Sequence, residues 1–133
     1  GFDMANAALK QTSEFQALME VVAALRAHYS TVAGKAEREM IAEKLRGNTA
    51  SAQRYKDTLA AMHVQHKAAL DLIADRLTTP AQLTATRKFL RSEADKANAF
   101  VKQLQQIKIS LAKLAEVAGF LTELVRGLTT ILR

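Results

Sequence analysis

The sequence predicts an all-α fold, an elongated antiparallel helical bundle with coiled-coil-like heptad packing. The 133 residues are 49% hydrophobic and only 5% aromatic, with one proline and five glycines, a composition that favours helices over strands. Apolar residues recur at alternating intervals of three and four. Turn signals divide the chain into three long helices, at about residues 3–46, 49–78 and 80–133, within a single helical domain, 1–133. The first or third helix can be broken to give four.

The helix expected at 3–46 carries one apolar stripe, and Gly34 is the point at which it could break. The segment "RGNTAS" should end it, because Gly47 suits a helix C-terminus and Asn48 or Thr49 can cap the next helix. Its stripe contains Met4, Ala8, Phe15, Leu18, Val22, Leu25, Tyr29, Val32 and Ala36.

The helix expected at 49–78 contains an H-x-x-H pair, His63 and His66. Residues three apart on a helix can share a metal, but the E-x-x-H motifs of di-iron bundles are missing. We therefore expect no metal and no cofactor. His66 belongs to the apolar stripe and His63 faces outward. A buried His66 would make the packing sensitive to pH near 6.

The third segment begins with the clearest helix start in the chain. Thr79 can cap the first turn, Pro80 suits the first helical position, and Gln82 can complete a capping box. Thirteen of fifteen seam positions from Leu83 to Leu132 are apolar, and the exceptions are Thr86 and Glu93. This periodicity predicts one helix that continues to the end of the segment.

A single helix over 80–133 would be about 80 Å long, against about 45 Å for the second helix. Its C-terminal part would then project from the bundle. This part carries a second apolar row, formed by Val117, Phe120, Leu124 and Ile131. The chain could cover the row by folding back at Gly119 or near 103–106, by pairing with a second copy, or by binding another protein. We favour self-association or a partner.

Sequence motifs give no indication of an enzyme. No Gly-rich phosphate loop, G-x-S-x-G or H-E-x-x-H occurs, and the chain has no cysteine, so we expect no catalytic residues. The formal net charge is +6, and residues 80–133 hold nine Lys/Arg against four Asp/Glu. A basic outer face on this segment is a candidate anion-binding site, for nucleic acid, at Lys88, Arg91, Lys102, Lys113 and Arg126.

We therefore expect a non-enzymatic helical protein–protein interaction module, such as an adaptor, small chaperone, assembly subunit or immunity-type binder, of a kind typical of bacteria. Its partner is a second copy or another protein. The alternatives are the anion-binding module and a membrane-active amphipathic protein. No signal peptide or transmembrane segment is visible, which favours the cytoplasm. The expected interface contains Leu111, Leu114, Val117, Phe120, Leu121, Leu124, Val125 and Leu128.

Overall fold

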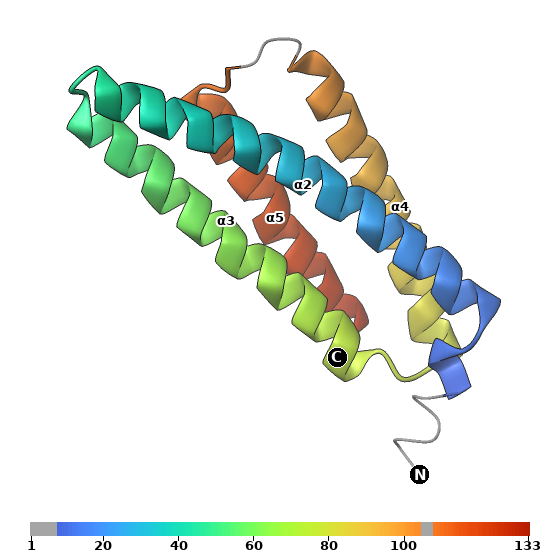
Figure 1. Ribbon diagram of the computed structural model, residues 1–133. Helices are drawn as coiled ribbons and strands as arrows, with labels where there is room; N and C mark the ends of the chain where they lie inside the picture. Colours follow the sequence, from blue (N-terminus) through green and yellow to red (C-terminus); the bar gives the residue numbers. More distant parts are fainter. Residues whose placement is uncertain (1–7, 105–107) are drawn as a thin grey trace.

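The computed structural model describes residues 8–104 and 108–133. These residues form helices and connections without any strand, which confirms the all-α prediction. The long helices keep the labels of Figure 1. They are α2 (Ser13–Leu45), α3 (Thr49–Arg76), α4 (Pro80–Gln103) and α5 (Leu111–Ile131).

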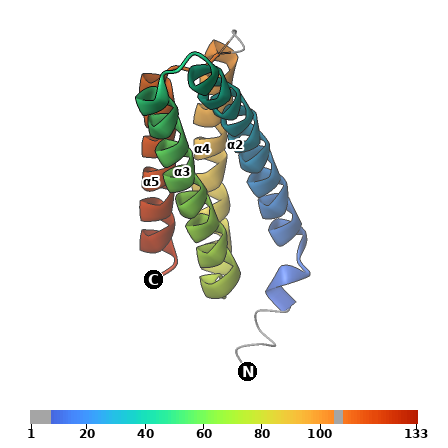
Figure 2. The ribbon, with the colours of Figure 1, turned by 60° about the vertical axis from the view of Figure 1, so that its left-hand side comes forward.

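The long helices form two antiparallel hairpins, α2–α3 and α4–α5, that stack on each other (Figures 1 and 2). Helix α2 packs along α4, and α3 packs along α5. The helices of each stacked pair run in the same direction (Figure 1). By contrast, α4 and α5 contact each other far less than the other neighbouring pairs do. The fold is thus a helical bundle with one loosely packed side, between α4 and α5.

The first turn along the described chain lies before α2, at Gln11 and Thr12. The Thr12 hydroxyl donates to the Leu9 carbonyl at 2.8 Å and accepts from the Phe15 amide at 3.2 Å, which is an N-cap. The prediction of an uninterrupted helix over 3–46 is therefore wrong at this turn. Residues 3–7 lie outside the described residues. The helix does not break at Gly34, the alternative left open by the sequence, because α2 continues through this residue.

The other two predicted turns are confirmed. Gly47 follows the end of α2 with a φ of 84°, a left-handed conformation that glycine adopts without strain. Helix α3 begins at Thr49, as predicted, and ends two residues before the predicted position 78. At the start of α4, the Thr79 hydroxyl accepts from the Gln82 amide at 3.1 Å, and the Gln82 side chain accepts from the Thr79 amide at 3.1 Å. This is the predicted capping box.

The prediction of one helix over 80–133 is wrong. Helix α4 ends at Gln103 and α5 begins at Leu111, so the chain folds back near the 103–106 alternative and not at Gly119. Residues 105–107 lie outside the described residues. The Ser110 hydroxyl caps α5 by accepting from the Lys113 amide at 3.1 Å. On α3, the Tyr55 hydroxyl donates to the Ile109 carbonyl at 2.7 Å and so ties this connection to the first hairpin.

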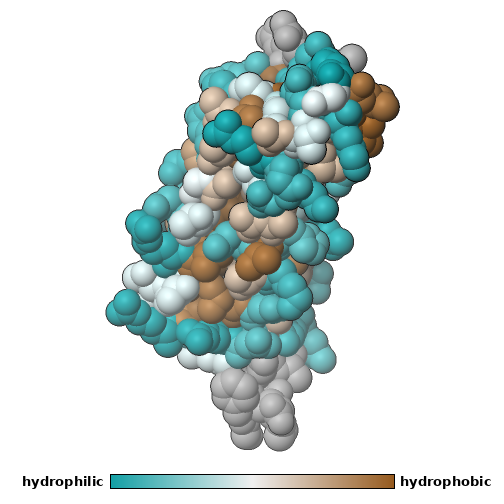
Figure 3. All heavy atoms as spheres, turned by 90° about the vertical axis from the view of Figure 1, so that its left-hand side faces the viewer, coloured by the Kyte–Doolittle hydropathy of each residue, from teal (hydrophilic) through white to brown (hydrophobic). Residues whose placement is uncertain are grey.

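The core lies between the two hairpins and is built from aliphatic side chains of every long helix. Its most completely buried members include Leu18 on α2, Met62 on α3, Leu90 on α4 and Leu128 on α5. Thr86 is fully buried among them, and its hydroxyl has no hydrogen-bond partner. In Figure 3, apolar side chains reach the surface in a hollow surrounded by hydrophilic ones. The bundle therefore does not cover all of its apolar surface.

Candidate functional site

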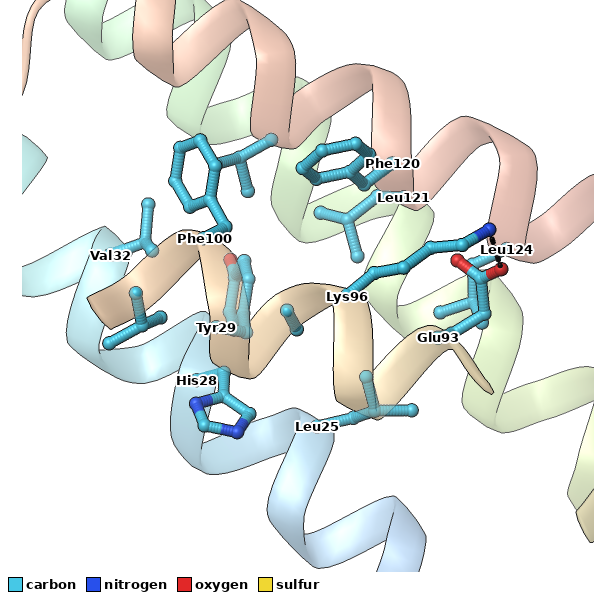
Figure 4. Close-up of a pocket in the computed structure, with 13 residues that line it drawn as sticks. Leu25, His28, Tyr29, Val32, Glu93, Lys96, Phe100, Phe120, Leu121 and Leu124 are labelled. Atoms are coloured by element: carbon cyan, nitrogen blue, oxygen red, sulfur yellow. Dashed lines mark hydrogen bonds and ion pairs between the residues drawn. The ribbon is translucent and has the colours of Figure 1, made fainter. Parts of the chain in front are cut away.

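An apolar groove lies on the loosely packed side of the bundle, where α4 and α5 face each other above α2. Its enclosed part has a cavity volume of about 60 Å³. Figure 4 shows walls formed by side chains of all three helices. They are Leu25, His28, Tyr29 and Val32 on α2, Glu93, Lys96, Ala97, Phe100 and Val101 on α4, and Val117, Phe120, Leu121 and Leu124 on α5.

Two phenylalanines bring α4 and α5 together at one end of the groove. The rings of Phe100 and Phe120 meet edge to face, with centroids 5.7 Å apart and an interplanar angle of 86°. The Lys113 ammonium lies 5.7 Å from the centroid of the Phe100 ring, within cation–π range. Phe100 is buried, whereas Phe120 remains 36% exposed. Phe120 is thus an aromatic side chain that the fold only partly covers.

Charged residues of both signs flank the groove and trough on α4 and α5, paired within each helix. On α4, the Lys96 ammonium lies 3.3 Å from the Glu93 carboxylate, and its aliphatic chain extends along the groove (Figure 4). On α5, Lys113 pairs with Glu116 at 3.5 Å, and Arg126 with Glu123 at 3.0 Å. The two pairs on α5 are exposed, and exposed pairs add little stability. The three pairs together carry no net charge, in a protein of net charge +6.

Beyond Lys96 the groove widens into an open trough of about 600 Å³ between the outer sides of α4 and α5. The Phe89 ring of α4 and Gly127 of α5 both line this trough. A Cβ added to Gly127 would lie 2.7 Å from two carbons of that ring, so the ring would have to move to admit a side chain there. Gly127 therefore lets the Phe89 ring of α4 lie against the backbone of α5.

The α2 wall of the groove is connected to α3 through Tyr29. Its ring stacks on His66 with centroids 4.5 Å apart and an interplanar angle of 6°. Burial, with added effects of Arg26 and His63, lowers the pKa of His66 below its usual 6.5. His66 is half-buried and His63 is exposed, which confirms the predicted orientation of this pair. Among residues 8–104 and 108–133, no group of three His, Cys, Asp or Glu side chains could hold a metal ion.

The structure separates the eight predicted interface residues into two sets. Four of them line the groove, namely Val117, Phe120, Leu121 and Leu124. The other four do not: Leu114 and Leu128 are fully buried in the core, and Leu111 and Val125 are half-buried against it. The first apolar row of α5 is thus covered largely by this chain itself. The second row, Val117, Phe120, Leu124 and Ile131, lines the groove and trough.

The five candidate anion-binding residues are all exposed but do not form one cluster. Lys88, Arg91 and Lys102 share the outer face of α4 and have no ion-pair partner among the described residues. Lys113 and Arg126 belong to α5, and each pairs with a glutamate of its own helix. Only the α4 trio therefore offers unpaired positive charge on a common face.

Sequence reasoning did not identify the α2 and α4 walls of the groove. One signal was present: Glu93 is the only charged residue in the seam from Leu83 to Leu132, and its side chain is only 12% exposed at the groove. Tyr29 was a second signal, as an amphipathic aromatic in the stripe of the first helix. Neither could be assigned to a groove without knowing that α5 turns back beside α4.

Among the described helices, none combines the length and the apolar character needed to cross a membrane. No protein-family model, curated protein or solved structure matches the chain.

Proposed function

We propose that the protein is a non-enzymatic helical protein–protein interaction module whose α4–α5 groove receives an amphipathic helix of another protein. The observation that carries this proposal is the apolar groove itself, whose α5 wall is formed by the second apolar row. Phe120, at its centre, is 36% exposed. Exposed apolar surface rimmed by charges is typical of protein-binding sites.

The dimensions of the groove favour a helix over a small molecule. Sites for drug-sized ligands usually enclose roughly 300–1,000 Å³. Here the enclosed part has only about 60 Å³, enough for part of one anchoring side chain, and it continues into the open trough of about 600 Å³. A helix with apolar residues at i, i+3 or i+4, and i+7 can place one apolar side chain in the enclosed part of the groove and the others along the trough.

The charges along α5 favour a different protein over a second copy of α5. From the N-terminal end of α5, its paired charges are Lys113, Glu116, Glu123 and Arg126, in the order positive, negative, negative, positive. This order is the same in both directions, so two α5 helices placed face to face would bring like charges together in either orientation. A partner helix with the opposite order would complement it.

Site-specific cross-linking tests this proposal. A photo-reactive amino acid replaces Phe120 in the groove or, as the matched control, Val64, which is 63% exposed on α3. The segment cross-linked through position 120 is then synthesised as a peptide and titrated against the wild type and Phe120→Glu. We expect the glutamate to weaken binding by about tenfold or more, because it places a charge against an apolar anchor.

Val64→Glu serves as the control in the same titration and should bind like the wild type. Circular dichroism melts must show that Phe120→Glu remains folded, and Phe120→Ala provides a milder variant if it does not. Equal cross-linking through positions 64 and 120, or equal peptide affinity of folded Phe120→Glu and wild type, would contradict the proposal.

A second candidate function is anion binding by the outer face of α4, favoured by the unpaired charges of Lys88, Arg91 and Lys102. Each phosphate contact adds about 0.9 to the slope of log K against log salt concentration. If nucleic acid binds there, replacing all three residues by alanine should lower that slope by about 2 to 3. A slope that does not change would exclude this face as the binding site.

A further inference from the structure

The connection between α4 and α5 differs in composition from the other two described connections between long helices. The α2–α3 turn uses Gly47 in a left-handed conformation, and the α3–α4 turn uses the Thr79–Pro80 stop signal. By contrast, the sequence "LQQIKIS" of residues 104–110 has neither glycine nor proline. The apolar spacing of three and four also continues through it, at Leu104, Ile107 and Leu111. Local sequence therefore fits an uninterrupted helix at the point where the chain bends.

Few interactions of described residues hold the bend. The Ile109 side chain is 2% exposed, and its carbonyl accepts from the Tyr55 hydroxyl at 2.7 Å. The Ser110 hydroxyl accepts from the Lys113 amide at 3.1 Å. In a continuous helix the Lys113 amide would donate to the Ile109 carbonyl instead. This change would leave only the Tyr55 and Ser110 hydroxyls, among these groups, without their present partners.

The packing of α4 and α5 makes their hairpin easy to open. Helix α4 packs mainly along α2, and α5 mainly along α3, whereas direct contact between α4 and α5 is sparse. Straightening the connection would therefore lose little packing within the hairpin itself. It would, however, expose the inner face of α5, where Leu114 and Leu128 are fully buried against the rest of the bundle.

The α3 helix of a second copy presents the same surface as the α3 helix of the first. It can therefore cover the inner face of the first copy's α5. Exposed apolar side chains at the end of α2 also favour such an arrangement. Ile41 is 54% exposed and Leu45 is 84% exposed. The α2–α3 turn and the α4–α5 connection lie at the same end of the bundle (Figure 1). Two copies stacked at this end would bring these apolar side chains towards each other.

From these observations we propose that two copies of the chain exchange α5, with α4 and α5 joined into one continuous helix in each copy. Each α5 then packs on α3 of the other copy and reproduces the interface of the single chain. The exchange is two-fold symmetric and closed, as in domain-swapped dimers. It does not depend on a partner in the α4–α5 groove.

Variants of the connection test the proposal, with mass measured by light scattering after concentrated protein is warmed to its melting midpoint and cooled. Tyr55→Phe and Ser110→Ala weaken the bent form, so each should raise the dimerisation constant by about tenfold. Leu111→Pro should abolish the dimer, because proline suits the first position of α5 and interrupts a continuous helix. Leu111→Ala removes the same side chain without this block and should still dimerise.

A distance measurement distinguishes exchange from simple end-to-end pairing. The chain has no cysteine, so spin labels can be attached to cysteines placed at Lys88 and Arg126. In the bent form these sites are close, since the Phe89 ring reaches Gly127. In a continuous helix they are 38 residues apart, or about 57 Å. Labelled chains diluted into an excess of unlabelled chains should show this long distance in the dimer fraction.

Two results would overturn the proposal. One is a dimer whose labelled chains keep the short distance, which would mean pairing without exchange. The other is a single-chain mass for the wild type, Tyr55→Phe and Ser110→Ala alike after the same treatment. Leu45→Glu adds an independent readout. Because Leu45 is exposed in the single chain, this substitution should leave the melting temperature of the single chain unchanged but lower the dimer fraction.

Discussion

The hydroxyl of Thr86 is an unusual feature of the core, because it is fully buried and has no hydrogen-bond partner. Burying an unpaired hydroxyl is unfavourable by about 1–3 kcal/mol in proteins. Other threonines in these helices, such as Thr84, donate to the carbonyl four residues earlier. Thr86 therefore occupies a seam position at the expense of stability.

Replacing Thr86 by valine should stabilise the protein by about 1 kcal/mol, because the shape is kept and the unpaired hydroxyl is removed. Urea unfolding of the variant and the wild type measures the difference. Thr84→Val is the control, since that hydroxyl is exposed and bonded to the Pro80 carbonyl. A less stable Thr86→Val would indicate that the hydroxyl has a partner in solution.

His66 makes stability depend on pH. Its lowered pKa means that the folded protein favours the neutral imidazole more than the unfolded chain does. This contribution is fully present above the unfolded pKa of 6.5 and is lost as the pH falls through the lower folded pKa. The melting temperature should therefore decrease between pH 7.5 and 5.

His66→Phe keeps an aromatic ring on Tyr29 but removes the titration, so its melting temperature should vary less over this range. Carboxylates also contribute to the pH dependence in both proteins. Subtracting the melting temperature of His66→Phe from that of the wild type at each pH removes this shared contribution. His63→Gln removes only the smallest of the three causes of the lowered His66 pKa, so this variant should keep most of the pH dependence of the wild type. A constant difference between wild type and His66→Phe would show that His66 does not carry the pH dependence.

The start of α4 shows how a local signal positions a helix. The Thr79 hydroxyl and the Gln82 side chain satisfy backbone amides reciprocally across the first turn. Thr79→Ala should destabilise the protein by about 1 kcal/mol, because one amide loses its acceptor. Thr79→Ser keeps the hydroxyl and should remain close to the wild type in chemical denaturation. Equal losses in both variants would mean that the hydroxyl is not the stabilising group.

Two glycines within α5 should respond oppositely to substitution by alanine. A Cβ at Gly119 would meet open space, so Gly119→Ala should add about 1 kcal/mol through helix propensity. At Gly127 the new methyl group would collide with the Phe89 ring, and the gain should be lost. In a Phe89→Ala background, however, Gly127→Ala should stabilise by about 1 kcal/mol. The same gain at Gly127 in both backgrounds would exclude close contact with Phe89.

The molecule consists of two helical hairpins, and the two helices pack more extensively on each other in the first hairpin than in the second. In the first, α2 and α3 pack along each other, and the Tyr29–His66 stack links them. In the second, α4 and α5 are held mainly by the first hairpin. This inequality produces both proposed properties: a groove open to a partner helix and an α5 that can exchange between copies.

The sequence allowed some of the groove to be predicted. The second apolar row was recognised, including Phe120, and it lines the groove and trough. The opposing walls were not, because Tyr29, Glu93 and Phe100 come together only through the arrangement of α2, α4 and α5. Helical periodicity states which residues share a face of one helix, but not which helix lies opposite.

By itself, the sequence determined the helical class, the turn at Gly47, the capping box at Thr79 and the two apolar rows of α5. These features depend on residues within one or two helical turns of each other, and caps and periodicity encode them directly. Only the tertiary structure decided that the chain bends before Leu111. The Tyr55 hydroxyl that holds the Ile109 carbonyl lies 54 residues away in the sequence, and the α3 surface that buries α5 is as remote. Local periodicity favoured a straight helix, and burial of the first apolar row against α3 outweighed it.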